Sequence, residues 1–198
     1  MRPLLWSSFA VVASLGLGGI VSVVPSQSLQ AVELQDGRTY FVQPPLLEDA
    51  KTTIDTVITW NPTYYFTLSI PENAGEPLAQ VVFEAKDTST ASREIRFDAE
   101  DTRAFTGTPG DRGDTLTIGN TTYDRDNQTV TVTFDPPIPP GSIVTIGLEP
   151  QRNPRQSGVY LFGVTAYPPG GETAYGQFIG YGRLQFYNDG GNLLPLSW

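Results

Sequence analysis

Short runs of alternating apolar and polar residues, separated by glycine and proline, are the feature that most constrains how this chain can fold. The clearest run is Thr129–Phe134, which reads TVTVTF. A period of two places both valines and the phenylalanine on one face of a strand and the threonines on the other. The DRDN sequence at Asp124–Asn127 is typical of a turn, so the region predicts an antiparallel hairpin with Thr121–Tyr123.

The same pattern recurs along the chain beyond residue 37, where apolar residues rarely show helical spacing. The 20 glycines and 17 prolines bound most of these runs. The candidate strands are Thr39–Gln43, Thr53–Thr59, Tyr64–Ile70, Ala79–Ala85, Glu94–Phe97, Thr115–Ile118, Gln128–Phe134, Ile143–Leu148, Val159–Tyr167 and Phe178–Tyr187. So many short strands predict an all-β fold, and we expect an immunoglobulin-like or jelly-roll-type antiparallel β-sandwich with little helix.

Three features depart from regular alternation. The run Asp135–Gly141 (DPPIPPG) contains four prolines, which cannot donate to a sheet ladder, so we expect a loop or a sheet edge there. Gly180 and Gly182 in FIGYGRLQFY predict a bent strand with a closely neighbouring backbone. Helix is expected only as short pieces, at Pro45–Thr53 and as a turn near Asp98–Phe105.

The first thirty residues have the pattern of an export signal. Arg2 is the only charged residue before Glu33, and the run Leu4–Val24 is apolar and rich in small residues. A basic start followed by such a run is typical of a secretory signal-peptide helix. We expect cleavage within Ser28–Val32, where small residues follow the apolar run.

Cleavage would divide the chain into a signal peptide at residues 1–31, a β-sandwich domain at residues 32–187 and a tail at residues 188–198. The alternative is an uncleaved membrane anchor, because the uncharged run approaches the ~20 residues that cross a bilayer. No cluster of lysine or arginine follows the run, so we expect removal and no stable membrane span afterwards. The expected location is extracytoplasmic, with the periplasm as the compartment.

Charge and composition exclude several classes of function. The formal net charge of −9 opposes binding to nucleic acid and to anionic lipid. The chain has no histidine and no cysteine, which excludes disulfides, thiolate or imidazole metal ligands and serine–histidine catalysis. We therefore assign no catalytic, cofactor-binding or metal-binding residues and no cofactor. An exported, non-enzymatic binding or structural module with an envelope protein or glycan as partner is the expected function.

Acidic residues leave two alternatives open. They gather, each group near an arginine, at Asp98–Asp101, Asp111–Asp114 and Asp124–Asp126. Oxygen ligands in turns suit calcium, so one alternative is a calcium-stabilised structural domain. The other is a carboxylate-dependent glycan hydrolase or lyase, which needs two carboxylates facing each other across a cleft. Ordinary surface ion pairs explain the pattern better than either alternative.

Aromatic residues could form a stacking platform for a sugar or another flat ligand. The candidates are Trp60, Tyr64, Tyr65, Phe66, Tyr160, Phe162, Tyr167, Tyr175 and Tyr181. Alternation places Tyr64, Phe66 and Leu68 on one face of a strand, where they would enter the core. The same alternation places Tyr65 on the opposite face, so we expect its ring to be exposed.

Four segments resemble a known family. They are Pro71–Leu78 (PENAGEPL), Arg103–Leu116 (RAFTGTPGDRGDTL), Phe134–Phe162 (FDPPIPPGSIVTIGLEPQRNPRQSGVYLF) and Phe178–Tyr187 (FIGYGRLQFY). In this order they resemble a cyanobacterial domain of unknown function, number 2808 in that series, over residues 35 to 187. The resemblance implies an exported protein with an N-terminal signal, from a cell with an outer membrane. It implies no catalytic or binding residues.

Overall fold

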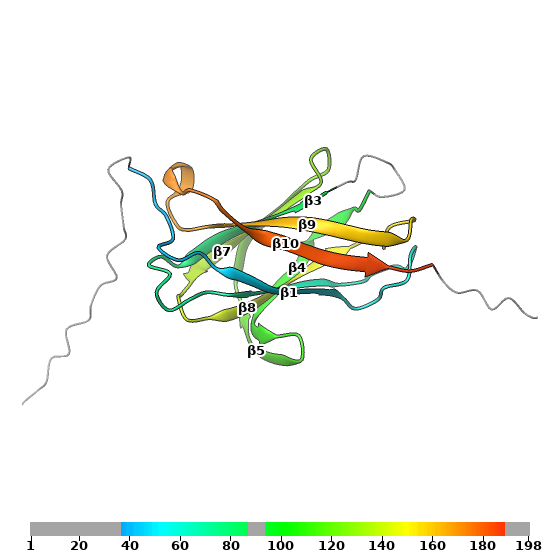
Figure 1. The fold of residues 1–198 in the computed structure, drawn as a ribbon, viewed down its shortest axis with the longest axis horizontal. Helices are drawn as coiled ribbons and strands as arrows, with labels where there is room; N and C mark the ends of the chain where they lie inside the picture. The colour runs from blue at the N-terminus through cyan, green and yellow to red at the C-terminus, as the bar shows by residue number, and fades with distance from the viewer. Residues whose placement is uncertain (1–36, 87–93, 189–198) are drawn as a thin grey trace, which may run out of the picture.

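The computed structural model describes residues 37–86 and 94–188, which form two five-stranded antiparallel sheets packed face to face (Figure 1). The first sheet has the order β1-β2-β8-β4-β5, with β1 Leu46–Thr52, β2 Tyr64–Ser69, β8 Ile143–Pro150, β4 Phe97–Thr108 and β5 Asp111–Leu116. The second has the order β10-β9-β3-β7-β6, with β10 Gln177–Phe186, β9 Gly158–Tyr167, β3 Leu78–Ala85, β7 Thr129–Ile138 and β6 Ile118–Asp124. The predicted antiparallel β-sandwich is confirmed.

Helix is minor, as expected. Within the described residues it consists of one short 3-10 turn at Gly171–Thr173. No helix of residues 37–86 and 94–188 is long and apolar enough to cross a membrane. The expected signal peptide at residues 1–31, and the expected tail beyond residue 188, lie outside the described residues.

The predicted hairpin is confirmed as β6 and β7. Asp124 closes its turn by accepting hydrogen bonds from the backbone N–H groups of Asp126, at 2.9 Å, and Asn127, at 3.1 Å. These bonds and one from the Asn127 side chain lower the pKa of Asp124. Alternating residues of β7, including Val130 and Val132, are buried between the sheets as the period of two predicts.

Aromatic rings dominate the core between the sheets. Phe66 of β2 packs against Phe83 of β3, with ring centroids 4.7 Å apart, and edge-on against Phe162 of β9, at 5.5 Å. All three side chains are fully buried, together with Tyr64 and Phe186. Because each large ring contributes substantial apolar area, this cluster is the main source of stability that ties the two sheets together.

Two helical expectations and several strand expectations are wrong. Of the expected strand Glu94–Phe97 only Phe97 belongs to a strand, and the expected strand Thr115–Ile118 contains the break between β5 and β6. Pro45–Thr53, expected as a short helix, contains β1, which pairs with β2 along its length. The turn expected near Asp98–Phe105 is part of β4, which pairs with β8 on either side of an irregularity. Thr53–Thr59, expected as a strand, is a loop, and Thr39–Gln43 makes only a single bridge, between Thr39 and Ala174. The secondary structure of these short segments of mixed polarity is determined by pairing with other strands rather than by their own residue pattern.

The proline-rich run Asp135–Gly141 is mostly an extension of β7, so the expectation of a loop is wrong for its first half. The prolines nevertheless lose no hydrogen bond to β3, because β7 does not pair with β3 along this stretch. The pairing of β7 with β3 jumps from Thr133 opposite Gln80 to Ile138 opposite Leu78, leaving the intervening residues outside the ladder. The prolines therefore lie where no ladder hydrogen bond is lost.

Strands β1 and β10, the edges of the two sheets, lie side by side and close one flank of the sandwich (Figure 1). The register of β10 shifts between Phe178 and Gly180, and Gly180 has a φ of 136°. A Cβ on Gly182 would lie 2.5 Å from the Phe66 ring and 3.0 Å from the Cβ of Ala50. The predicted bend is confirmed, but the atoms that approach Gly182 closely belong to side chains rather than to the neighbouring backbone that was expected.

Candidate functional site

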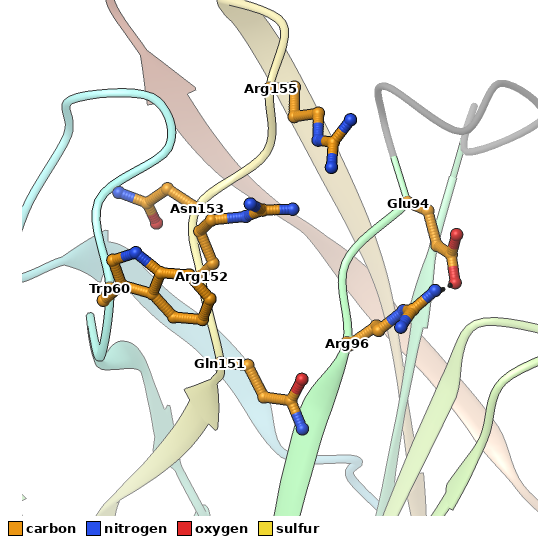
Figure 2. A pocket seen from close by; sticks show the side chains of 7 residues that line it. All are labelled: Trp60, Glu94, Arg96, Gln151, Arg152, Asn153 and Arg155. Atoms are coloured by element: carbon orange, nitrogen blue, oxygen red, sulfur yellow. Dashed lines mark hydrogen bonds and ion pairs between the residues drawn. The ribbon is translucent and has the colours of Figure 1, made fainter.

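A pocket opens at one end of the sandwich, where three loops meet (Figure 2). These loops are residues 53–63 between β1 and β2, the segment that leads into β4, and residues 151–157 between β8 and β9. The cavity has a volume of about 270 Å³. Its lining is Trp60, Glu94, Arg96, Gln151, Arg152, Asn153 and Arg155.

Backbone hydrogen bonds fix the three loops relative to one another. The N–H of Asn61 donates to the carbonyl of Gln151, at 3.1 Å, and the N–H of Asn153 donates to Thr59, at 2.8 Å. On the other side, the N–H of Gln151 donates to the carbonyl of Arg96, at 2.8 Å. The pocket wall is thus a short extension of sheet-like pairing beyond the ends of the strands, which holds the lining side chains in place.

Asn153 is the residue that locks this framework together. Its side chain is buried, and its Nδ2 donates to the backbone carbonyls of Ile54, at 2.9 Å, and Thr56, at 2.7 Å. Its Oδ1 accepts a hydrogen bond from the hydroxyl of Tyr64, at 2.8 Å. Burial, followed by the proximity of Tyr160, raises the pKa of Tyr64 well above its ordinary value, so the hydroxyl remains a donor. One amide thereby ties the 53–63 loop to both β2 and the 151–157 loop.

Trp60 is presented to solvent by a strained loop. Its side chain is 64% exposed, and the guanidinium of Arg152 lies 5.2 Å from the centre of its ring. Ile58 and Asn61, on either side, have φ values of 64° and 52°. A β-branched residue in the left-handed region costs on the order of 1–3 kcal/mol and persists only where surrounding contacts impose it. Here the N–H of Ile58 is held by the carbonyl of Pro154, at 3.1 Å.

Positive charge predominates in the pocket. Among the residues that the structure describes, Glu94 is the only carboxylate that lines the pocket, and Arg125, at 2.8 Å, and Arg96, at 3.3 Å, both pair with it. The hydrogen bond from Arg125 is the main reason that the pKa of Glu94 is lowered, so this carboxylate is ionised at neutral pH. Within the described residues neither Arg152 nor Arg155 has an ion-pair partner. The pocket is therefore cationic although the chain as a whole is acidic.

The acidic groups singled out from the sequence do not converge. Among residues 37–86 and 94–188, no group of three or more acidic side chains is placed to hold a metal ion. Asp124 is used in the β6–β7 turn. Glu149, which faces Asp98 across the β4–β8 pair, accepts from the Thr63 hydroxyl at 2.9 Å and contacts Arg103 at 3.3 Å. Burial is the main cause of the raised pKa of Glu149.

Glu76 is a second carboxylate whose pKa burial raises. It lies in the β2–β3 connection, at the end of β2 remote from the pocket, and its Oε1 is buried with no hydrogen-bond partner among the described residues. A folded-state pKa above the ordinary 4.5 means that folding favours the protonated form. The resulting penalty is absent below about pH 4.5 and is fully present once the pH exceeds the folded-state pKa.

Replacing Glu76 with glutamine is therefore expected to raise the melting temperature at pH 7, by a gain of no more than about 1 kcal/mol. Below pH 4.5 the variant and the original protein should melt together. Thermal melts monitored by circular dichroism across this pH range would measure the difference. Glu72→Gln, in the same connection, is the matched control. A constant difference at all pH values would show that the carboxyl charge is not the cause.

The division of the aromatic residues between core and surface differs from the prediction made from the sequence. Tyr64, Phe66 and Leu68 are buried as predicted, but the expectation that Tyr65 is exposed is wrong. Arg112, from β5, donates to the Tyr65 hydroxyl at 2.8 Å and covers its ring, which packs edge-on against Phe105. Strand alternation identifies the face of a sheet but not what a neighbouring hairpin places over it.

Three of the aromatic candidates are exposed. Trp60 lines the pocket, whereas Tyr175 and Tyr181 lie elsewhere. Tyr181 of β10 packs edge-on against Phe178, at 5.0 Å, over Gly163. The two rings are inclined by 65°, so they do not form a flat platform. Of the exposed aromatic residues, Trp60 alone lies in the pocket.

Sequence reasoning identified Trp60 but missed the arginines around it. The available signal was local: QRNPR places two arginines within four residues of an otherwise acidic chain. Trp60 and Arg152 each precede an Asn-Pro dipeptide, in WNP and in RNPR. Nothing in the sequence shows that residues about 90 positions apart meet at one end of the sandwich.

Fold and site together define a β-sandwich module with a preformed cationic pocket between its end loops. The chain belongs to the family described as "Protein of unknown function (DUF2808)", whose model matches residues 38–186. No curated protein sequence matches the chain.

Several solved structures with a related arrangement are bacterial adhesin and pilin proteins of low sequence identity. The collagen adhesin CNA of S. aureus is 9% identical over 71% of this chain and 49% of that one, with a TM-score of 0.42. The major pilin subunit BcpA of Bacillus cereus, in a D312A form, is 14% identical over 73% and 41%, with a TM-score of 0.44. The major pilin SpaD of Corynebacterium diphtheriae is 14% identical over 71% and 33%, with a TM-score of 0.45. This chain spans less than half the length of each, and the likeness carries no functional argument.

Proposed function

We propose that this protein is a non-catalytic binding module and that the pocket between its end loops is the binding site. The observation that carries the proposal is the exposed Trp60 beside Arg152, which has no ion-pair partner among the described residues, both held on a backbone framework that the Asn153 side chain joins. Exposed aromatic and arginine side chains on rigid loops are the residues that most often dominate binding energy. A site held rigid before binding loses little entropy when a ligand arrives.

The charge pattern supports binding over hydrolysis at this pocket. A glycan hydrolase needs two carboxylates, one of them protonated, on opposite sides of the scissile bond. Within the described part of the chain the pocket has one lining carboxylate, Glu94, and the hydrogen bond from Arg125 lowers its pKa. Glu149 and Glu76, whose pKa values are raised, do not line the pocket.

We also propose that the module works outside the cytoplasm, in the periplasm of a cyanobacterial cell. The proposal rests on the sequence at residues 1–31, which we infer to be a removed signal peptide followed by a domain at residues 32–187 and a tail at residues 188–198. Intact mass and N-terminal sequencing of the protein from fractionated cells test this. A mature start within Leu29–Glu33 in the periplasmic fraction is expected. A full-length chain in the membrane or the cytoplasm would refute export by cleavage.

Binding is tested by sedimentation with insoluble envelope material prepared from the same cells. We expect the protein to sediment with this material, and Trp60→Ala to weaken the apparent affinity roughly tenfold or more, as for a central aromatic contact. Tyr181→Ala, which removes another exposed ring, 55% exposed and outside the pocket, is the matched control. Equal binding by the Trp60 variant would exclude the pocket as the site. Release of soluble reducing sugar during the incubation would favour the hydrolase.

A further inference from the structure

Two arginines that line the pocket have no ion-pair partner among the described residues, which indicates an anionic ligand. Figure 2 shows the guanidinium groups of Arg152 and Arg155 pointing into the space between the loops, toward Arg96. Arg96 shares Glu94 with Arg125, whereas Arg152 and Arg155 have no ion-pair partner within residues 37–86 and 94–188. Guanidinium groups bind carboxylates through two parallel hydrogen bonds. Unpaired arginines gathered in an acidic protein are therefore placed to bind an anion.

The remaining lining selects a ligand rich in oxygen. Apart from Trp60, the walls carry mainly the hydrogen-bond donors of the guanidinium groups, together with the amide of Gln151, whose Nε2 already donates to Asp98 at 3.4 Å. Asn153 contributes nothing to a ligand, because its side chain already uses its hydrogen bonds within the framework. An apolar ligand would leave these donors without partners, at a cost for each of them. Hydroxyl and carboxylate oxygens would satisfy them.

Trp60 adds a flat apolar surface beside the cations. Its indole is 64% exposed, and the negative face of an aromatic ring attracts polarised C–H groups such as those of a pyranose ring. The cavity of about 270 Å³ lies just below the ~300–1,000 Å³ of drug-sized ligand pockets, so it suits one or two sugar residues. The net charge of −9 opposes an extended, densely charged polyanion and favours a short or sparsely charged one.

We propose that the pocket binds a short acidic saccharide, that is, a sugar unit that carries a carboxylate. The carboxylate lies on Arg152 and Arg155, the ring hydroxyls bond to Arg96 and Gln151, and the C–H face of the sugar stacks on Trp60. This ligand assignment rests on the proposed function, since it names the ligand class of the same site.

Trigalacturonate is a suitable probe, and the same trisaccharide with its carboxyl groups reduced to alcohols is its neutral counterpart. Titration calorimetry with the mature protein is expected to show binding of the acidic trisaccharide that weakens as salt is added. Reduction of the carboxyl groups should weaken binding at least about tenfold, as should Arg152→Gln or Arg155→Gln, because each removes a charged hydrogen-bonding pair. Arg183→Gln, an equal change of charge on the exposed part of β10, should leave the affinity unchanged.

Equal affinity for the acidic and the reduced trisaccharide would overturn the proposal without relying on any variant. Absence of binding to trigalacturonate, while sedimentation with envelope material still depends on Trp60, would reject the ligand class and leave the proposed function standing. If the protein does not bind trigalacturonate and its sedimentation with envelope material does not depend on Trp60, the proposed function itself is rejected.

Discussion

Replacing Asn153 with alanine is expected to lower the free energy of unfolding by about 3 kcal/mol, because one buried and two partly buried hydrogen bonds lose their partner at once. The carbonyls of Ile54 and Thr56 and the hydroxyl of Tyr64 would remain in place without the amide that they contact. The 53–63 loop would also lose its side-chain tie to β2, so ligand binding should weaken together with stability. Urea unfolding monitored by circular dichroism measures the first effect.

Two further variants make this result interpretable. Tyr64→Phe removes a single hydroxyl from the same network and should cost about 1–2 kcal/mol. Asn73→Ala, which removes an exposed side-chain hydrogen bond to Gln43, should change the free energy of unfolding by less than about 0.5 kcal/mol. If Asn153→Ala were as mild as Asn73→Ala, the amide would not be holding the loops.

A side chain at Gly182 is expected to force apart the flank where β1 meets β10. The Cβ of valine would lie 2.5 Å from the Phe66 ring and 3.0 Å from the Cβ of Ala50, and both neighbours are packed within the sandwich. Overpacking of this kind costs about 2–3 kcal/mol. Since valine favours strands more than glycine does, any loss of stability for Gly182→Val must come from packing.

Gly110 supplies the control for this prediction, because a Cβ there would meet nothing within 4 Å. Gly110→Ala lies in the turn between β4 and β5 and should be close to neutral in the same urea unfolding experiment. A stable Gly182→Val protein would mean that β10 can move away from β1 without loss, which is incompatible with a tightly packed flank.

Strong periodicity made much of the fold predictable. Thr129–Phe134 could be assigned to a strand and a hairpin because six alternating residues and a turn sequence agree. A close approach at Gly182 was likewise predictable, since a glycine between large residues in a strand has few other structural uses, but the sequence did not show that the neighbours are the Phe66 and Ala50 side chains. These assignments depend on residues near one another in the sequence, for which pattern and structure coincide.

Long-range pairing explains the failures. Pro45–Thr53 has a short apolar face that fits a helix as well as a strand, and only its pairing with β2 makes it β1. Tyr65 lies on the outer face of its sheet, as alternation requires, but Arg112 from the β4–β5 hairpin covers it. Local pattern contains neither the identity of the partner strand nor the path of a distant hairpin.

The candidate site was only partly predictable for the same reason. Trp60 belongs to the aromatic residues that the sequence singles out, and it is exposed. Arg152, about 90 residues further along the chain, pairs with Trp60 through a backbone bridge that no local sequence pattern predicts. The role of Asn153 could not be predicted either, because an asparagine before proline usually indicates a turn rather than a buried side chain that joins loops by hydrogen bonds.

The most direct test of this account is the location of ligand contacts on the sandwich. Nuclear magnetic resonance of the nitrogen-15-labelled protein, titrated with solubilised envelope glycan, reports each backbone amide and the indole N–H of Trp60. The account predicts that shifts concentrate on the Trp60 indole, on residues 94–96 and on residues 151–155. Shifts confined to Phe178 and Tyr181 on β10, with the Trp60 indole unmoved, would contradict it.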